Sequence, residues 1–222
     1  MDDLALDNDI AANLVVAQVE DASLVARRRE QIVAAALKLF CEQGFHQTTI
    51  KEVAQEAGIS AGLVYQYVRE KEDILLLVIL SGLSRRPAEL HAAAERHAHP
   101  VARLKAAFST YCRLTARNKR ALALAYRASK ALDGRRLRLI MGEESKVNGV
   151  FAHYVRECID SGDFRAVNVD IVTYQLIMAA HTWVLKGWNI SRRMKLKNYT
   201  DANFDILTCG LLSREGRRSL AT

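Results

Sequence analysis

The sequence predicts an all-α protein, with a small three-helix module near the N-terminus and a larger helical domain after it. Pro occurs only at positions 87 and 100, and the 222 residues include only 11 Gly. Ala, Leu, Arg, Lys and Glu dominate the composition, and these residues favour helix over sheet. The length suffices for one sizeable helical body with a module attached, or for two small domains that share a helix.

Hydropathy and cysteine usage narrow the class of protein further. The longest apolar run, from Ile74 to Leu80, is far shorter than the roughly 20 residues that span a bilayer. The N-terminus is acidic where a secretory signal is basic, and the four cysteines have neither disulfide nor metal-ligand spacing. We therefore expect a soluble, cytoplasmic protein with no membrane partner.

The net charge of +7 is distributed unevenly along the chain. Residues 1–22 carry six acidic side chains and no basic one, and residues 23–75 carry seven of each. Residues 76–222 carry 25 basic side chains against 12 acidic ones. The larger C-terminal part is therefore the basic part, which bears on its partners.

The first predicted elements are an arm and a long helix. Residues 1–22 have little hydrophobic periodicity, so we expect a flexible acidic arm there. Ser23 is a suitable helix cap, and Ile32, Ala36 and Phe40 recur on one helical face, which predicts a helix over 24–43. Gly44 then supplies the left-handed residue that ends such a helix.

Two short helices follow. Thr49 and Glu52 have the spacing of a capping box, so the second helix begins there. Gly58 permits a sharp reversal, and Ser60 caps a third helix that we expect over 60–67. A connecting helix continues from Ile74 to Ser84 and ends before Pro87.

The remaining helices are predicted from their apolar periodicity alone. We expect them at residues 88–97, 100–117, 119–131, 135–160, 168–189 and 200–213.

The third helix carries side chains suited to a nucleic-acid groove. Two short helices preceded by a longer one match the helix-turn-helix plan, which places the second short helix in the major groove. Small or apolar residues stand near its start, and groups that hydrogen-bond phosphates or bases follow. The small residues are Ala61, Gly62 and Leu63, and the hydrogen-bonding ones are Tyr65, Gln66, Tyr67 and Lys71.

These residues belong to a longer pattern, which includes Gly44-Phe45, Thr48-Thr49-Ile50, Ala57-Gly58-Ile59-Ser60, Leu63-Val64-Tyr65-Gln66-Tyr67-Val68 and Lys71-Glu72. Through this pattern, over about 50 residues, the chain resembles the TetR/AcrR family of regulators. Val64 and Val68 depart from it, since Leu and Phe are commoner at these positions. Neither change threatens the fold.

The resemblance implies a role for each position. The phosphate contacts would be Thr48, Tyr65, Tyr67 and Lys71, the base-facing residues Ala61, Gly62, Leu63 and Gln66, and the small core Ile50, Val53, Ile59, Val64 and Val68. The capping residues Thr49 and Ser60 belong to the same predicted DNA surface. The alternative is that Tyr65 and Tyr67 are half-buried aromatics and Lys71 is a solvated charge. Arg27, Arg28 and Arg29 fit either DNA contact or a solvated helix face.

The resemblance also divides the chain, giving a DNA-binding domain at 23–70 and a ligand-binding and dimerisation domain at 71–222. In the family, the last two helices pair with their symmetry mates in a homodimer. The matching helices here are rich in apolar residues, namely Ile171, Tyr174, Ile177, Met178, Phe204, Ile206, Leu207 and Leu211. Such faces need a partner, although part of them fills the monomer's own core. A dimer of this kind binds an inverted-repeat operator.

A small-molecule effector is the other expected partner. An excess of basic residues in 71–222 suggests an anionic effector, or equally an ordinary solvated surface. The stretch 126–132 and the Trp183/Trp188 segment are similar to family members that sense acyl-CoA thioesters. Such a ligand needs an apolar slot and cations, and most of the aromatic candidates also fit a core. The candidates are Phe108, Tyr111, Tyr126, Arg127, Lys130, Phe151, Tyr154, Tyr174 and Trp183.

Other functions find little support in the sequence. His91, His97 and His99 flank Pro100 without the spacing of a metal site, so we expect no metal. No nucleophile pattern or phosphate-cradling glycine motif is present, which argues against an enzyme and against a cofactor. We therefore expect a ligand-responsive regulator, most simply a repressor released by its effector. The rivals are a helical enzyme and an architectural DNA-binding protein.

Overall fold

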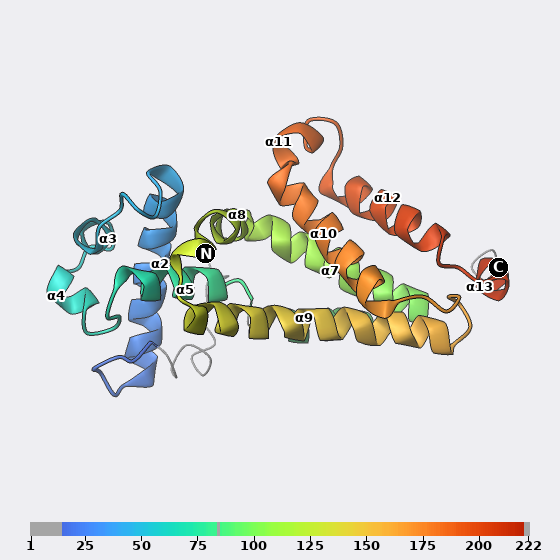
Figure 1. Cartoon of the computed structure of the whole chain (residues 1–222), viewed down its shortest axis with the longest axis horizontal. Helices are drawn as coiled ribbons and strands as arrows, with labels where there is room; N and C mark the ends of the chain where they lie inside the picture. The colour runs from blue at the N-terminus through green and yellow to red at the C-terminus, as the bar shows by residue number, and fades with distance from the viewer. Residues whose placement is uncertain (1–14, 84, 220–222) are drawn as a thin grey trace. The chain divides into compact units, whose positions relative to one another are not determined.

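The computed structural model describes residues 15–83 and 85–219, and over these residues the predicted all-α fold is confirmed (Figure 1). The helices are α2 (Ala22–Glu42), α3 (Ile50–Glu56), α4 (Ala61–Val64), α5 (Lys71–Leu80), α6 (Arg86–Ala94), α7 (Pro100–Arg117), α8 (Lys119–Ala128), α9 (Gly134–Asp160), α10 (Val169–Leu185), α11 (Gly187–Ile190), α12 (Leu196–Cys209) and α13 (Arg214–Ser219). One 3-10 turn, Ser129–Ala131, joins α8 to α9.

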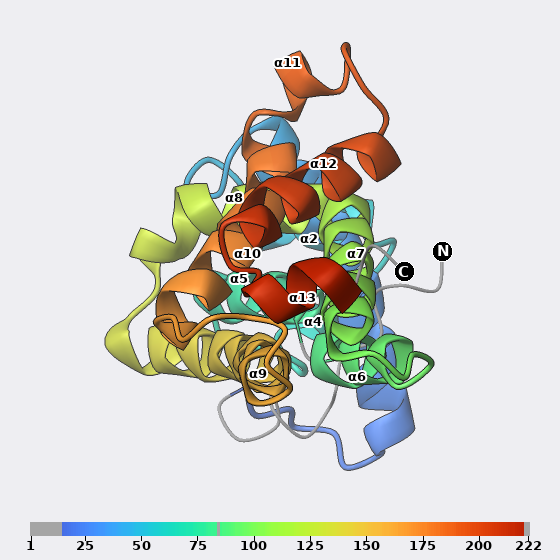
Figure 2. The same cartoon turned by 90° about the vertical axis from the view of Figure 1, so that its right-hand side faces the viewer.

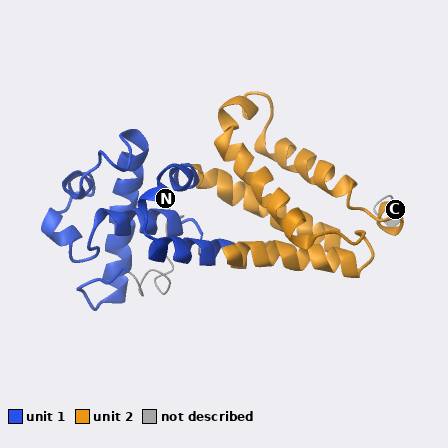
Figure 3. Ribbon diagram, viewed as in Figure 1, with its two compact units in different colours: residues 1–85, 120–144 blue, residues 86–119, 145–222 orange. Residues whose placement is uncertain are grey.

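The chain folds into two compact units (Figure 3). Unit 1 consists of residues 1–85 and 120–144, and unit 2 of residues 86–119 and 145–222. Both units contain part of α9, which is one continuous helix. This division differs from the predicted boundary at residue 70, because α5, nearly all of α8 and the start of α9 pack with the N-terminal helices.

The N-terminal helix ends follow the predicted capping chemistry, with one correction. Thr49 and Glu52 form the expected capping box, each side chain accepting a hydrogen bond from the other residue's backbone N–H. Gly44 and Gly58 both have positive φ, as the two chain reversals require. The cap of α2 is Asp21 and not Ser23, because the Asp21 carboxylate accepts from two backbone N–H groups of the first turn.

Several predicted boundaries were inaccurate. The helices expected to end at residues 84, 97 and 131 end at Leu80, Ala94 and Ala128. The helix expected over 60–67 is regular only over Ala61–Val64, and turns complete the segment to residue 67. The helix expected over 168–189 ends at Leu185, since Lys186 leaves helical geometry before the short α11. The last long helix begins at Leu196 instead of residue 200, and α13 follows it.

The core of unit 1 surrounds α5. All residues from Ile74 to Leu80 are buried, because α5 packs on α2 and lies in one apolar cluster with Ala121, Leu124 and Ile140 from α8 and α9. Burial on every side explains an apolar run without amphipathic periodicity. Searched over the described residues, no helix has the length and apolar character needed to cross a membrane.

Part of the predicted flexible arm packs onto this unit. Val15 is fully buried, and the backbone N–H of Gln18 donates to the carbonyl of Gln66 at 2.8 Å. The Arg29 guanidinium donates to the carbonyls of Val15 and Tyr67. Residues 15–21 are therefore attached to the segment that follows α4. Residues 1–14 of the predicted arm lie outside the described residues.

Unit 2 is a helical bundle with an aromatic core. In it α7 packs against α6, α10 and α12, and α10 lies beside α12 in both views (Figures 1 and 2). Phe108 and Tyr111 of α7 meet Phe151 and Tyr154 of α9 in the buried cluster. The predicted helical C-terminal domain thus has its own hydrophobic core.

A network of charged side chains joins the start of α9 to the start of α5 within unit 1. The Arg136 guanidinium donates to Asp73 at 2.6 Å and also binds Glu70 and Asp133. The other oxygen of Asp73 accepts the backbone N–H of Arg69 at 2.9 Å. Asp73 is nearly inaccessible to solvent, so this pairing compensates for a buried carboxylate.

We predict that Asp73→Ala destabilises the protein by about 3 kcal/mol, because it leaves the largely buried Arg136 guanidinium without the most buried of its carboxylate partners. Denaturant unfolding followed by circular dichroism measures the change. Lys197→Ala is the matched control, since Lys197 pairs with Asp201 in solvent and should change stability by less than about 1 kcal/mol. Equal effects of the two substitutions would contradict the prediction.

Candidate nucleic-acid interface and ligand-binding unit

The short helix α4 presents an accessible edge. Gly62, Tyr65 and Gln66 are exposed, and Ala61 and Leu63 are partly exposed. Ser60 fixes the start of the helix, because its hydroxyl accepts the backbone N–H of Leu63 at 3.1 Å. Small side chains at the start of a helix allow its backbone to approach another surface closely. This edge has the shape and hydrogen-bonding groups that a major groove accepts.

The two tyrosines after α4 point in opposite directions. The Tyr65 residue is 49% exposed, whereas Tyr67 is 2% exposed and belongs to the core of unit 1. Side chains two positions apart in a helical turn cannot share a face, which is the reason for the difference. The predicted phosphate contact by Tyr67 is therefore corrected, because its ring packs inside the unit.

Thr48 is also buried and needs the same correction. Its hydroxyl donates to the carbonyl of Gly44 at 2.8 Å and accepts from the Gln43 amide at 3.3 Å. Both bonds lie within the turn between α2 and α3. Its neighbour Thr49 is exposed and caps α3, so of these two residues only Thr49 has accessible surface for a phosphate.

Lys71 is engaged with the same turn. Its ammonium donates to the carbonyls of Phe45 at 2.8 Å, Thr48 at 2.9 Å and His46 at 3.2 Å, and it lies 4.5 Å from the centre of the Phe45 ring. Three donors already satisfied by three acceptors leave the ammonium little capacity for a phosphate. Lys71 thus fixes the turn that precedes α3. The sequence did not predict this structural role for Lys71.

The arginines at the start of α2 do not behave alike. Arg29 is buried, and loss of hydration lowers the pKa of its guanidinium while nearby Asp73 opposes that change. Arg28 donates to Gln31 at 2.9 Å, and Arg27 is exposed. Arg29 is therefore a structural residue, and Arg27 has the most accessible side chain of the three.

The predicted ligand-binding residues divide between the two units. Phe108, Tyr111, Phe151 and Tyr154 come together in the core of unit 2, where the rings of Tyr111 and Phe151 meet edge to face at 5.4 Å. Trp183 is half-buried and lies against Tyr199. Tyr174 is exposed on α10. Tyr126, Arg127 and Lys130 are exposed residues of unit 1.

Sequence reasoning missed a polar group inside the core of unit 2. The hydroxyl of Tyr111 and Nε2 of His181 are 2.8 Å apart, and both residues are buried. The guanidinium of buried Arg86 lies 5.6 Å from the centre of the Tyr111 ring. Burial and the positive charge of Arg86 lower the pKa of His181 to about 4. The signal in the sequence was a single histidine within the apolar stretch of α10.

The last two long helices carry some of the predicted exposed apolar residues. Ile171, Tyr174 and Met178 are exposed on α10, and Ile206 is exposed on α12. Ile177 and Phe204 are buried in the unit's own core. Leu207 and Leu211 are partly exposed. The predicted apolar set is thus divided between an internal face and an outer one.

The predicted absence of a metal can be compared with the described part of the chain only. Among those residues, no group of three or more His, Cys, Asp or Glu side chains is arranged to hold a metal ion. His91 instead contacts the hydroxyl of Tyr154 at 2.9 Å through Nδ1, and that hydroxyl donates to Glu95 at 3.2 Å.

Comparison with known families accounts for both parts of the chain. Residues 32–78 match the family described as bacterial regulatory proteins, tetR family, and residues 97–208 match a tetracyclin repressor-like C-terminal domain. The chain is 37% identical to the HTH-type transcriptional regulator HbdR of Aromatoleum sp. strain CIB, over 95% of this chain and 92% of that protein. These relatives are regulators and not enzymes.

Solved structures show the same fold at low sequence identity. A bacterial regulatory protein of the tetR family from Rhodococcus RHA1 superposes with a TM-score of 0.75 at 18% identity, covering 82% of this chain and 96% of that one. The regulator FadR from Bacillus subtilis, in complex with stearoyl-CoA, superposes with a TM-score of 0.68 at 19% identity, covering 82% and 98%.

We predict that the buried His181 makes the protein less stable in acid. The pKa of His181 lies near 4 in the fold and near 6.5 in the unfolded chain, so the unfolded state binds more protons between these values. Stability contributed by neutral His181 is complete above pH 6.5 and falls by roughly 3 kcal/mol as the pH decreases to 4. Unfolding of the wild type and His181→Gln over this range measures it. The stability gap between them should shrink towards pH 4, and a constant gap would contradict the prediction.

Proposed function

The chain belongs to the TetR family of bacterial regulatory proteins, and on this premise we propose that it is a repressor which an anionic, acyl-CoA-like effector releases from its operator. DNA binding and transcriptional regulation follow from the family. The observation that supports the proposed DNA contact is the accessible edge of α4, capped by Ser60 and carrying exposed Tyr65 and Gln66.

We propose that a reduced set of residues contacts DNA. Gly62 and Gln66, with Ala61 and Leu63 beside them, face the bases, and Tyr65, Thr49 and Ser60 reach the backbone. Three other residues support DNA binding indirectly, because they stabilise the turn before α3 and the core beneath α4. They are Thr48, Tyr67 and Lys71.

The proposed assembly is a homodimer through α10 and α12. The support is an outer apolar face that the monomer's core does not use, formed by Ile171 and Tyr174 on α10 and Ile206 on α12. Burying such side chains against a second copy is favourable by about 25 cal/mol per Å² of apolar surface. Two copies related by a twofold axis present two α4 edges to successive turns of an inverted repeat.

The proposed effector class rests on charge and on a structural relative. Residues 76–222 carry 25 basic against 12 acidic side chains, which favours an anionic ligand. A regulator of the same fold, FadR from B. subtilis, was solved with stearoyl-CoA. An acyl-CoA thioester combines an apolar chain with phosphates. The effector would bind unit 2 and favour a geometry that is incompatible with the operator.

We predict that the protein binds DNA from the region upstream of its own gene and that a CoA thioester releases it. Fluorescence anisotropy of labelled DNA, with scrambled DNA as competitor, measures both steps across thioesters of different chain length. Weak, sequence-independent binding would favour an architectural protein. Binding that no thioester weakens would remove the proposed effector class.

The contact assignment is tested in the same assay by a matched tyrosine pair. Tyr65→Phe removes an exposed hydroxyl and should weaken operator binding by about 2- to 10-fold, the value of one hydrogen bond. Tyr67→Phe removes the hydroxyl of a buried ring and should leave affinity unchanged. Gln66→Ala should alter base preference. The reverse order of the two tyrosine variants would contradict the assignment.

We predict that Ile206→Asp dissociates the dimer at micromolar concentration, because it places a carboxylate in the proposed apolar interface. Sedimentation velocity gives the mass in solution. Met141→Asp is the control, since Met141 is also an exposed apolar residue but lies on α9 within unit 1. Loss of the dimer in the control, or its retention in Ile206→Asp, would contradict the proposed interface.

A further inference from the structure

The segment that joins α10 to α12 has an unusual composition. Between positions 171 and 200 the chain has no acidic residue and five basic ones, and both tryptophans of the protein fall in the same stretch. The basic residues are Lys186, Arg192, Arg193, Lys195 and Lys197. Figure 1 shows the segment around α11. A cationic stretch without local carboxylates creates a positive potential that attracts anions.

This segment lines an open hollow on the surface of unit 2. The hollow has a volume of about 460 Å³, and its lining consists of Trp183 and residues 191–196. That volume falls within the roughly 300–1,000 Å³ range of small-molecule sites. Three of the lining residues, Arg192, Arg193 and Lys195, are basic. The hollow therefore combines room for a ligand with a dense positive charge.

No carboxylate of the described residues neutralises the three lining cations. Across the described residues, Arg192, Arg193 and Lys195 form no ion pair. The next cation in sequence, Lys197, behaves differently, because it pairs with Asp201 at 2.7 Å. Hydrogen bonding to that carboxylate raises the pKa of Lys197. The acidic partners of this region thus begin beyond the hollow, and its own cations keep their donors for a ligand.

An aromatic side chain forms one wall of the hollow. The Trp183 ring lies 5.2 Å from the Tyr199 ring at an angle of 48°, and the Tyr199 hydroxyl donates to the carbonyl of Ala179 at 2.6 Å. These contacts hold the indole in place between α10 and α12. Trp188, on α11, is 70% exposed. The fixed indole of Trp183, in the same lining as two arginines, suits a ligand that has both a flat ring and phosphates.

A second hollow adjoins the first. It has a volume of about 260 Å³ and is lined by Ser109 and Arg113 of α7 and by Leu196, Lys197, Thr200 and Asp201 of α12. Leu196 lines both hollows. A ligand with phosphates at Arg192 and Arg193 could therefore extend its less charged part along α12 towards α7.

From these features we propose that the hollow at Trp183 and residues 191–196 binds the phosphorylated adenosine portion of a CoA thioester. The proposal rests on the effector class proposed above and locates its anionic end. Arg192, Arg193 and Lys195 bind the phosphates, and the indole of Trp183 or Trp188 packs against the adenine ring. Free adenine nucleotides share this chemistry, so the test must separate the two sources.

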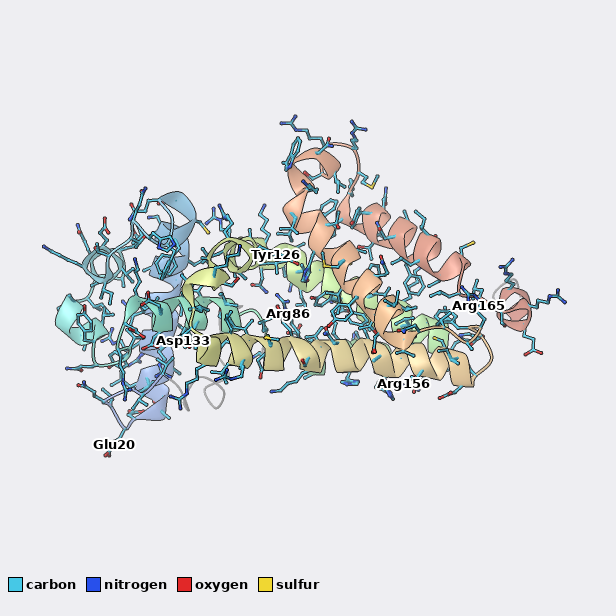
Figure 4. All side chains as sticks on the ribbon, viewed as in Figure 1. Glu20, Arg86, Tyr126, Asp133, Arg156 and Arg165 are labelled. Atoms are coloured by element: carbon cyan, nitrogen blue, oxygen red, sulfur yellow. The ribbon has the colours of Figure 1, made fainter. Side chains whose placement is uncertain are left out.

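The test measures binding of free CoA to the full-length protein by quenching of tryptophan fluorescence. We expect Arg192→Ala/Arg193→Ala to weaken CoA binding by at least roughly 10-fold, because charge-assisted bonds to phosphate are among the stronger polar contacts. The matched control is Arg156→Ala/Arg214→Ala, which removes two exposed arginines of the same unit that form no ion pair with any described residue (Arg156 is labelled in Figure 4). CoA should bind this control like the wild type. Thermal unfolding and operator binding without ligand should be unchanged in both variants.

Additional binding measurements identify the ligand and test this proposal independently of the proposed function. ADP binding much more weakly than CoA would support a CoA site, and ADP binding equally well would overturn it in favour of a general nucleotide site. Failure of CoA to bind, or equal binding by both variants, would also overturn it. Attachment to phosphatidylglycerol vesicles that depends on Arg192 and Arg193, without CoA binding, would indicate a lipid surface instead. Failure of the proposed function would appear separately, as operator DNA that no thioester releases from the wild type.

Discussion

The pairing of Arg136 with Asp73 is the constraint on which the organisation of unit 1 depends. It joins the first turn of α9 to the first turn of α5, and the second oxygen of Asp73 holds the backbone N–H of Arg69. Arg69 follows the turn that carries Tyr65 and Tyr67. A single buried carboxylate thus fixes the end of the candidate DNA-binding segment and the beginning of the long helix. Because a buried charge is costly without its partner, the three segments are held in one arrangement.

The apolar core around α5 explains why the compact units do not follow the division expected from family resemblance. Sequence motifs define the helix-turn-helix as residues 23–70, since that is where the recognisable pattern lies. Its apolar face is larger than those residues can cover, and Ala121, Leu124 and Ile140 complete the core around α5. The DNA-binding unit therefore includes the start of α9, a helix that also contributes to unit 2.

Local chemistry could be predicted from the sequence, and so could the small core that contains Val53, Val64 and Val68. The burial of individual polar and aromatic residues could not. The capping box at Thr49, the left-handed Gly44 and Gly58 and most helix positions follow from rules that involve neighbouring residues only. Whether Tyr65 or Tyr67 is buried depends on which side of α4 packs against the core. The helix is too short for hydrophobic periodicity in the sequence to identify that side. Lys71 and Arg29 read as surface cations in sequence. Both instead donate to backbone carbonyls that only the fold brings near them. For the same reason His181 was missed, because its partner Tyr111 is 70 residues away.

The basic side chains of the protein fall into two groups, those that donate hydrogen bonds within the described part of the fold and those that do not. Arg29, Lys71 and Arg136 are committed to carbonyls and carboxylates within unit 1, where they hold the DNA-binding segment in place. Arg192, Arg193 and Lys195 have no such commitment among the described residues. A net charge of +7 therefore says little about where an anion binds, since part of it is already used internally. The positive charge available to a small anionic ligand is concentrated where acidic residues are absent from the sequence, between α10 and α12. On this reasoning the proposed effector site in unit 2 lies where accessible cations have no carboxylate partner among the described residues.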